Sequence, residues 1–305
     1  LIKKSFLGAL IPMFALGFLL AIAFNQFGNF GLKDSLINAI PLCVISSAIA
    51  IPSVRNLSNH NKEFVIYESS LSDILGVLLF NFLALNETID RHSFGHFGIQ
   101  LLIITAISFI ATIGLSFLLN KIEHHIKFVP IILLVVLIYA VSKIYHLPGL
   151  IFILIFGIAI GNLDELKRFK WIEKFKPDEL NKEVIKFKEL TIEAAFLIRA
   201  LFFLLFGYMI ETSEVLNTNT LHWAFIIVFF IFSFRAIQLK LSKFPLKPLL
   251  FIAPRGLITI LLFLSIEPLH TISIVNKSLI IQIIILTALI MMFGLMSNKN
   301  HQKKT

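Results

Sequence analysis

The stretch Phe64-Val-Ile-Tyr-Glu-Ser-Ser-Leu-Ser-Asp-Ile-Leu-Gly76 decides the fold of this chain. It lies in an apolar segment, residues 64–85, yet it carries two carboxylates, Glu68 and Asp73. An ionisable residue inside a membrane span costs about 2.5–3.5 kcal/mol on insertion scales, so it marks a functional site by default. At about 1.5 Å per residue, a helix that starts near Phe64 places Asp73 about 14 Å deep, close to the middle of a bilayer.

Ten apolar segments can be read along the 305 residues. They are 5–24, 35–53, 64–85, 98–119, 128–145, 149–161, 191–211, 221–242, 248–266 and 278–296. Apolar residues make up 57% of the chain and charged residues 15%, with a mean hydropathy of +0.90. This composition excludes a disordered chain and an ordinary soluble enzyme. Because about 20 apolar residues cross the hydrocarbon core, we predict an all-α polytopic membrane protein with about ten transmembrane helices.

The distribution of Lys and Arg gives the predicted orientation. Counted in alternate loops, 20 lie on one side and three, Lys33, Arg91 and Lys277, on the other. Cytoplasmic loops carry the excess of basic residues, so both ends of this chain are predicted to be cytoplasmic. The same bias accounts for the net charge of +9, so we expect a lipid bilayer as partner and no nucleic acid.

The longest polar stretch, 162–190, holds eight basic and seven acidic residues. We predict that it is a cytoplasmic charged linker between one part of the bundle, 1–161, and a second part, 191–305. Apolar residues at helical spacing favour a helix within the linker, lying along the membrane interface, with a solvated linker as the alternative. These residues are Val184, Ile185, Phe187 and Leu190.

Two segments, 35–53 and 248–266, contain residues that interrupt a helix. Proline removes a backbone donor, and backbone groups freed at membrane depth are tolerated only where protein or a water-filled cavity satisfies them. Such residues and their polar neighbours are Pro41, Ser46, Ser47 and Pro52 in the first segment, and Pro248, Pro254 and Gly256 in the second. We expect two broken helices at a transport site.

Each broken segment is the middle one of three, which predicts an internal repeat. The triplets are 5–24, 35–53 and 64–85, and 221–242, 248–266 and 278–296. We count both triplets as starting on the cytoplasmic side. An unrecognised crossing would reverse the second triplet, so the sense of the repeat stays open.

The residues around Asp73 favour binding of a small cation or a proton. Ser69 lies four residues before Asp73 on the same helical stripe, and Ser72 is adjacent to it. A carboxylate with nearby hydroxyls supplies the hard oxygen ligands that suit an alkali cation. The same carboxylate binds a proton, and competition between the two ligands is the basis of exchange.

Three arginines, Arg199, Arg235 and Arg255, lie about 10–12 Å inside their segments at the helical rise. Each could neutralise a buried acid or extend its charge to the cytoplasmic face. Glu68 is the acid nearest to all three in depth, and depth alone does not choose among them.

Motifs of enzymes are missing from the sequence. The 14 glycines form no phosphate-binding or dinucleotide-binding pattern, and there is no HExxH motif. The single cysteine, Cys43, excludes a cysteine-based zinc site. We expect a protein that is not an enzyme and that needs no cofactor.

With these residues in place, the sequence resembles the monovalent cation:proton antiporter superfamily, the sodium/proton exchangers. The family's Glu-Ser-x-x-Asn-Asp motif is similar to residues 68–73, and its Arg-Gly motif to Pro254-Arg255-Gly256-Leu257. An arginine some twenty residues earlier matches Arg235. The Phe-rich stretch 200–207 is similar to a family helix that ends in glycine.

The resemblance implies a role for each matched residue. Asp73 would bind the monovalent cation and the proton, with Ser69 and Ser72 beside it, and Glu68 and Arg235 would form a structural ion pair. Arg255 would support the unwound region of the second broken helix. The residues predicted to support the two breaks are Arg255, Ser46, Ser47, Pro52, Pro254 and Gly256.

The sequence also departs from the family pattern. Ser72 replaces an asparagine, and the family's Thr-Asp-Pro is missing from the first broken segment, where Ser46 and Ser47 stand. With Asp73 as the one midplane carboxylate, exchange of one cation for one proton is the expected stoichiometry. The family has about three further helices before this point, so we expect an N-terminally truncated member that forms a homodimer in its full-length form.

The predicted function is a secondary antiporter in a bacterial inner membrane that exchanges a monovalent cation, sodium, for protons by alternating access. A transport-inactive relative with a sensing or regulatory role is one alternative. A channel, or a symporter for an organic anion, is another.

Overall fold

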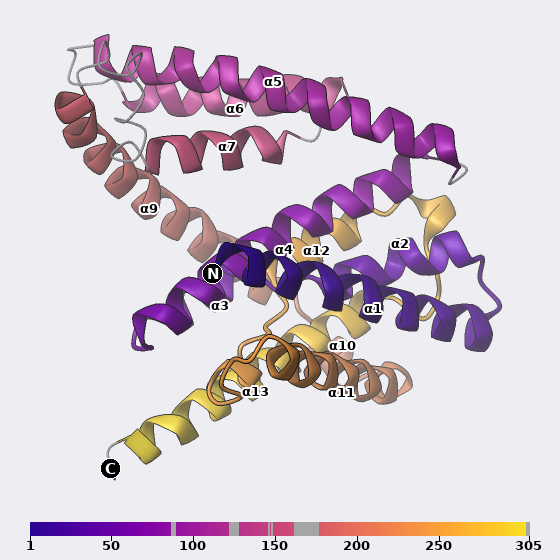
Figure 1. Cartoon of the computed structure of the whole chain (residues 1–305). Coiled ribbons are helices and arrows are strands. Elements are labelled where there is room, and N and C mark those ends of the chain that lie inside the picture. Colours follow the sequence, from indigo (N-terminus) through magenta and orange to yellow (C-terminus); the bar gives the residue numbers. More distant parts are fainter. Residues whose placement is uncertain (87–89, 122–127, 146, 148, 162–176, 303–305) are drawn as a thin grey trace. The chain divides into compact units, whose positions relative to one another are not determined.

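The computed structural model describes residues 1–86, 90–121, 128–145, 147, 149–161 and 177–302, and regular structure in these ranges is helical. The chain divides into two compact units, Leu1–Glu87 with Phe202–Thr305, and Thr88–Leu201. The elements are α1 (Ile2–Gly28), α2 (Leu32–Cys43), α3 (Ser47–Ser53), α4 (Asn59–Leu85), α5 (Arg91–Lys121), α6 (Phe128–Ile144), α7 (Leu150–Gly161), α9 (Pro177–Tyr208), α10 (Thr212–Val215), α11 (Thr218–Leu241), η2 (Leu249–Phe251), α12 (Leu257–Leu264), η3 (Pro268–His270) and α13 (Lys277–Gln302) (Figure 1).

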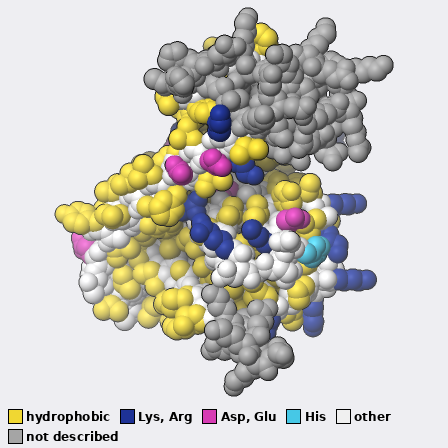
Figure 2. Space-filling view, turned by 90° about the vertical axis from the view of Figure 1, so that its left-hand side faces the viewer, with side chains coloured by type: hydrophobic (Ala, Val, Ile, Leu, Met, Phe, Trp, Pro, Cys, Tyr) yellow, Lys and Arg dark blue, Asp and Glu magenta, His cyan; other side chains and the backbone are white. Residues whose placement is uncertain are grey.

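Seven spans in the described part of the chain are long and apolar enough to cross a membrane. They are Ile2–Gly28, Leu32–Ser53, Asn59–Leu85, Arg91–Leu118, Val184–Tyr208, Thr218–Leu241 and Lys277–Ser297. Two shorter apolar helices, Phe128–Ile144 and Leu150–Ile160, and the interrupted stretch from η2 to α12 occupy the other three predicted segments. Hydrophobic side chains cover much of the face in Figure 2. The fold is therefore that of an all-helical polytopic membrane protein, and the count of ten crossings stays a prediction.

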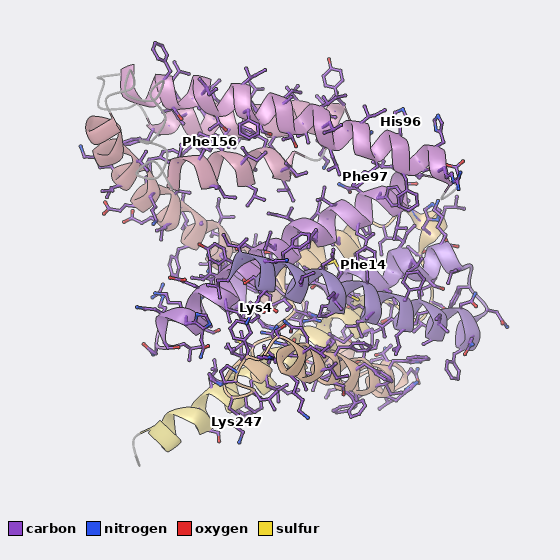
Figure 3. The ribbon with its side chains drawn as sticks, viewed as in Figure 1. Lys4, Phe14, His96, Phe97, Phe156 and Lys247 are labelled. Atoms are coloured by element: carbon purple, nitrogen blue, oxygen red, sulfur yellow. The ribbon has the colours of Figure 1, made fainter. Side chains whose placement is uncertain are left out.

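The unit Thr88–Leu201 is held together by an apolar cluster between its helices. α7 packs along α5, and α6 contacts both. Ile104 of α5, Ile131 of α6 and Phe152 of α7 are completely or almost completely buried in this cluster, which also includes Phe156 (Figure 3) and, from α9, Phe187.

The second half of the predicted linker is part of a long helix. α9 runs from Pro177 to Tyr208, so the charged residues 177–190 continue directly into the apolar segment predicted at 191–211. Val184 and Phe187 are buried, whereas Ile185 is exposed. Residues 162–176 lie outside the described part of the chain, and the linker role of 162–190 stays a prediction.

The other unit gathers both predicted triplets. α1 packs against α2 and α4, and α11 packs against α1 and α13. A buried apolar cluster joins the two triplets around Phe64 and Val65 of α4, Leu239 of α11 and Leu249 of η2. Two segments far apart in the sequence therefore share one core.

The two triplets run in opposite directions. Near the start of α1, Lys4 Nζ donates to the carbonyl of Ser242, just after α11, at 3.2 Å. Near the end of α1, the rings of Phe24 and Phe27 contact Trp223 in the first turns of α11, with centroids 6.1 and 5.9 Å apart. α1 and α11 are therefore antiparallel.

The prediction that both triplets start on the cytoplasmic side of the membrane is therefore wrong. Antiparallel neighbours in one unit begin at opposite ends, so the first helices of the two triplets start on opposite sides, and the repeat itself stays a prediction. The basic residues agree with this arrangement: Lys3 and Lys4 lie in the first turn of α1, whereas Lys240 lies in the last turn of α11 and Lys243 and Lys247 follow it.

Polar contacts connect the helix ends at the side of this unit that lies away from Lys4. His270 Nδ1 lies 2.7 Å from Asp34 Oδ1, and the Asn38 side-chain amide donates to the His270 carbonyl at 2.7 Å. Gln282 of α13 donates to the carbonyls of Val215 and Asn217 before α11. These contacts satisfy backbone groups that the ends of short helices leave free.

A glycine permits the close approach of α4 to the end of α2. A Cβ on Gly76 would overlap the side chain of Val44, which is completely buried. The absence of a side chain at Gly76 therefore keeps the stretch after α2 beside Asp73 on α4.

We expect Gly76→Ala to destabilise the protein by about 1–3 kcal/mol, because overpacking displaces side chains or backbone. Unfolding of the purified protein in detergent micelles measures the change. Gly98→Ala on α5 is the control, since a Cβ there meets open space and Ala favours the helix. Equal effects of the two substitutions would contradict this account of Gly76.

Candidate functional site

Two interrupted helical stretches, one from each predicted triplet, meet inside this unit. α2 ends at Cys43 and α3 begins at Ser47, while η2 ends at Phe251 and α12 begins at Leu257. The first break lies between Pro41 and Pro52 of the sequence and not at either one, because both prolines are inside helical turns. The two irregular stretches contact each other directly, since the Ser46 amide donates to the Pro254 carbonyl at 2.9 Å.

Arg255 satisfies carbonyls that these breaks leave free. Its guanidinium donates to the carbonyl of Leu42 at 2.8 Å, to that of Ala253 at 2.8 Å and to that of Cys43 at 3.4 Å. The side chain is almost completely buried. A cation at the carboxyl end of α2 also opposes the negative end of its dipole. Arg255 thus connects the second break to the end of the helix before the first.

Asp73 lies at the first break. Its Oδ2 accepts hydrogen bonds from the hydroxyl of Ser47 and from the Ser47 amide, the latter at 3.3 Å. Its Oδ1 is buried and has no hydrogen-bond partner among the described residues. A buried acceptor without a donor is costly, so one oxygen of this carboxylate is available to a ligand.

The other predicted ligands have hydrogen bonds of their own. Ser69 Oγ donates to the Val65 carbonyl at 2.7 Å, within its own helix. Ser72 Oγ accepts from the Ile45 amide at 2.9 Å and so ties α4 to the first break. Lone pairs of both hydroxyl oxygens remain, but the direct partner of Asp73 is Ser47.

Ser46 and Gly256 lie against each other where the breaks meet. The Ser46 hydroxyl is buried and has no hydrogen-bond partner in the described ranges. A Cβ on Gly256 would fall 2.8 Å from Ser46 Oγ, so glycine is what permits this approach.

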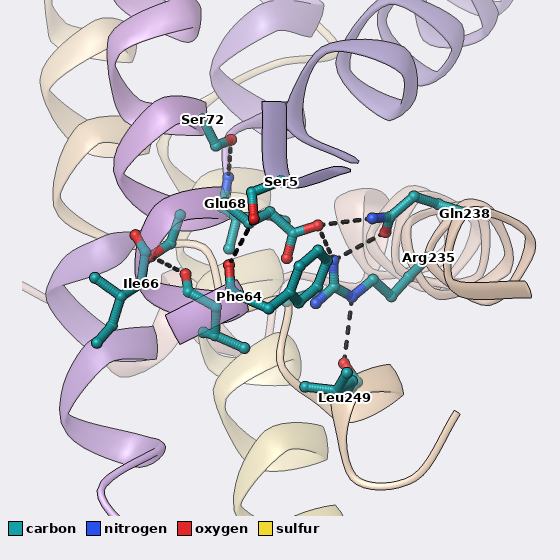
Figure 4. A network of polar contacts seen from close by, with 12 residues as sticks. Ser5, Phe64, Ile66, Glu68, Ser72, Arg235, Gln238 and Leu249 are labelled. Atoms are coloured by element: carbon teal, nitrogen blue, oxygen red, sulfur yellow. Dashed lines mark hydrogen bonds and ion pairs between the residues drawn. The ribbon is translucent and has the colours of Figure 1, made fainter. Parts of the chain in front are cut away.

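Glu68 and Arg235 are brought together in a buried network (Figure 4). Arg235 Nη1 lies 2.5 Å from Glu68 Oε1, and the two side chains are 3% and 1% exposed. Arg235 Nε also donates to the Leu249 carbonyl at 3.2 Å. Gln238 accepts from Arg235 at 2.9 Å and donates to Glu68 at 2.8 Å. The pair therefore fixes α4 to α11 and η2.

Sequence reasoning missed two members of this network. Gln238 lies three residues after Arg235, so helical spacing could have placed it beside the arginine. Gly8 of α1 lies against the pair, because a Cβ there would be 2.9 Å from Glu68 Oε1, and no local pattern marked it. Arg199 lies on α9, in the unit Thr88–Leu201.

A small cavity of about 20 Å³ adjoins the network. It is lined by Gly8, Ala9, Pro12, Leu16, Cys43, Ile45, Ser72, Ile231, Phe234, Arg235, Gln238, Ala253 and Arg255. Its volume corresponds to roughly one water-sized ligand.

Comparison with known proteins gives one family. The model of the transmembrane region of sodium/hydrogen exchangers matches residues 1–297, almost the whole chain. No curated protein matches the chain.

We expect Glu68→Gln and Arg235→Met each to lower the free energy of unfolding by about 3–5 kcal/mol, because each leaves one buried charge without its partner. The double variant should lose clearly less than the sum, since neither charge remains. Unfolding in detergent micelles measures all three. Strictly additive losses would show that the two side chains do not stabilise each other.

Proposed function

Because this chain belongs to the sodium/hydrogen exchanger family, we propose that it exchanges a monovalent cation, sodium, for protons across the membrane, with both ligands competing for Asp73. The observation that carries the proposal is the carboxylate itself: Ser47 bonds one oxygen, and the other is buried without a partner in the described residues. A cation or a proton at Oδ1 would remove the cost of that buried acceptor. Only one of them fits at a time.

The surrounding oxygens support a site for a partly dehydrated alkali cation. We propose that Ser69 and Ser72, one turn before and directly before Asp73 on α4, contribute hydroxyl oxygens, because both are buried. The two helix breaks supply backbone carbonyls where they meet. Hard oxygen ligands of this kind suit alkali cations and not soft metals.

The remaining polar residues act as structural supports in this proposal. The Glu68–Arg235 pair holds α4 against α11, and Arg255 holds the second break against α2. Among the described residues neither arginine bonds to the Asp73 carboxylate oxygens, whose hydrogen-bond donors come from Ser47. The charge of the site therefore changes by one unit on binding of either ligand, as one-for-one exchange requires.

Membrane topology follows from the charge distribution. The basic residues near the start of α1 and the end of α11 lie at one end of the unit, which we assign to the cytoplasm with both ends of the chain. We propose ten crossings, two of them broken helices, and rocking of the ion-binding bundle against the other helices. A homodimer of the full-length protein and a bacterial inner membrane complete the proposal.

The proposal is tested by Asp73→Asn. In inside-out vesicles, the wild-type protein should produce sodium-dependent pH changes, and the variant should produce none, because an amide binds neither a proton nor a cation in place of the carboxylate. A wild-type protein without exchange would favour the transport-inactive alternative. Exchange that survives in Asp73→Asn would remove Asp73 from the mechanism.

Competition also predicts the pH dependence of exchange. On the acidic side of the profile, the sodium concentration at half-maximal rate should rise by about tenfold for each unit by which the pH falls, since protons exclude sodium by mass action at one site. Initial rates over a sodium series at several pH values measure this. A half-saturating concentration that does not change between acidic and alkaline pH would refute competition.

We expect Ser47→Ala to move the pH profile of exchange to higher pH by about one unit. The hydroxyl of Ser47 donates to the ionised carboxylate, and a hydrogen bond to a charged group contributes about 1.5–3 kcal/mol. Without it, protons hold Asp73 more tightly. Ser53→Ala on the same helix is the matched control, because its hydroxyl donates to the Ala50 carbonyl instead. Superimposable profiles for wild type and Ser47→Ala would contradict this role.

A further inference from the structure

The cavity beside the Glu68–Arg235 pair contains more positive than negative charge. Among its lining residues the charged side chains are Arg235 and Arg255, and both are almost completely buried. Glu68 bonds to Arg235 and balances one of the two charges. Arg255 bonds to three backbone carbonyls and to no carboxylate in the described ranges. One full positive charge at the cavity is thus opposed only by peptide dipoles.

One donor of a lining residue also lacks a hydrogen-bond acceptor. Arg235 Nη2 is buried and has no hydrogen-bond partner among the described residues, although Nε and Nη1 of the same guanidinium are bonded. Burying a charged donor without an acceptor costs more than burying a neutral one. The remaining polar atoms around the cavity include the Ser72 hydroxyl and the Gln238 amide.

We propose that this cavity binds a monatomic anion, with chloride as the ligand. Size and charge carry the assignment. The volume of about 20 Å³ admits one water-sized ligand, and chloride is only slightly larger than water. Two guanidinium groups around one small cavity repel each other in a medium of low dielectric constant. An anion between them offsets that repulsion, whereas a neutral water molecule does not.

The bound anion would contact several elements of this unit at once. Arg235 belongs to α11 and Arg255 to the second break, while Cys43 ends α2 and Ser72 belongs to α4. Chloride at this position would hold the second break against α11. The cavity adjoins the proposed cation site through Ser72, but the Asp73 carboxylate does not line it, and the anion is a structural ligand that is not transported.

The test is the thermal unfolding of the purified full chain in detergent, with sodium chloride or sodium bromide replacing sodium gluconate at constant ionic strength. We expect a saturable rise in the unfolding midpoint of about 3 °C or more for both halides. Gluconate, which is too large for the cavity, gives none. Broadening of the chloride NMR signal by the protein, reversed by bromide, reports binding directly.

Cys43→Asp and Cys43→Ser make the test specific to this cavity. The aspartate adds a carboxylate beside the arginines and should abolish the halide response and the NMR broadening. The serine keeps the size and charge of the cysteine and should retain both. A midpoint that rises without saturation, or equally in Cys43→Asp, would overturn the proposal in favour of water or of a general salt effect. Neither readout depends on cation exchange, so failure here and failure of the proposed function are distinguishable.

Discussion

The structure depends on the satisfaction of backbone groups where two helices stop in the middle of an apolar unit. Lipid offers no hydrogen bonds, so each freed carbonyl and amide must find a partner inside the protein. The Arg255 guanidinium serves the carbonyls of Leu42, Cys43 and Ala253, and the Ser46 amide reaches Pro254 across the gap. Ser72 receives the Ile45 amide. These contacts allow the helices to be interrupted inside the apolar unit. Asp73 lies beside the first interruption.

Charge is distributed unevenly over this centre. Glu68 and Arg235 compensate each other and lock α4 to α11, while Arg255 is compensated by carbonyl dipoles. Asp73 has one hydroxyl and one amide as donors and no cation bonded to it in the described part of the chain. The proposed competition between a cation and a proton rests on this arrangement.

Sequence reasoning succeeded where a signal is local. Apolar runs predict helices, and a carboxylate or arginine within a run predicts a buried polar centre, so Glu68, Asp73, Arg235 and Arg255 could all be named. It failed where contacts cross the chain. Depth could not choose the partner of Glu68, the hydroxyl that bonds Asp73 came from Ser47 and not from its own helix, and Gly8 carries no pattern. The direction of the second triplet was also miscounted, although the lysines after α11 contained the answer.

The antiparallel arrangement of α1 and α11 has a consequence for how such a chain inserts into the membrane. Apolar helices insert equally well in either direction, and the basic residues flanking them select one. In this chain lysines lie at the start of the first helix of one triplet and at the end of the first helix of the other. By this rule the lysines at opposite ends of α1 and α11 favour insertion of the two helices in opposite directions across the bilayer.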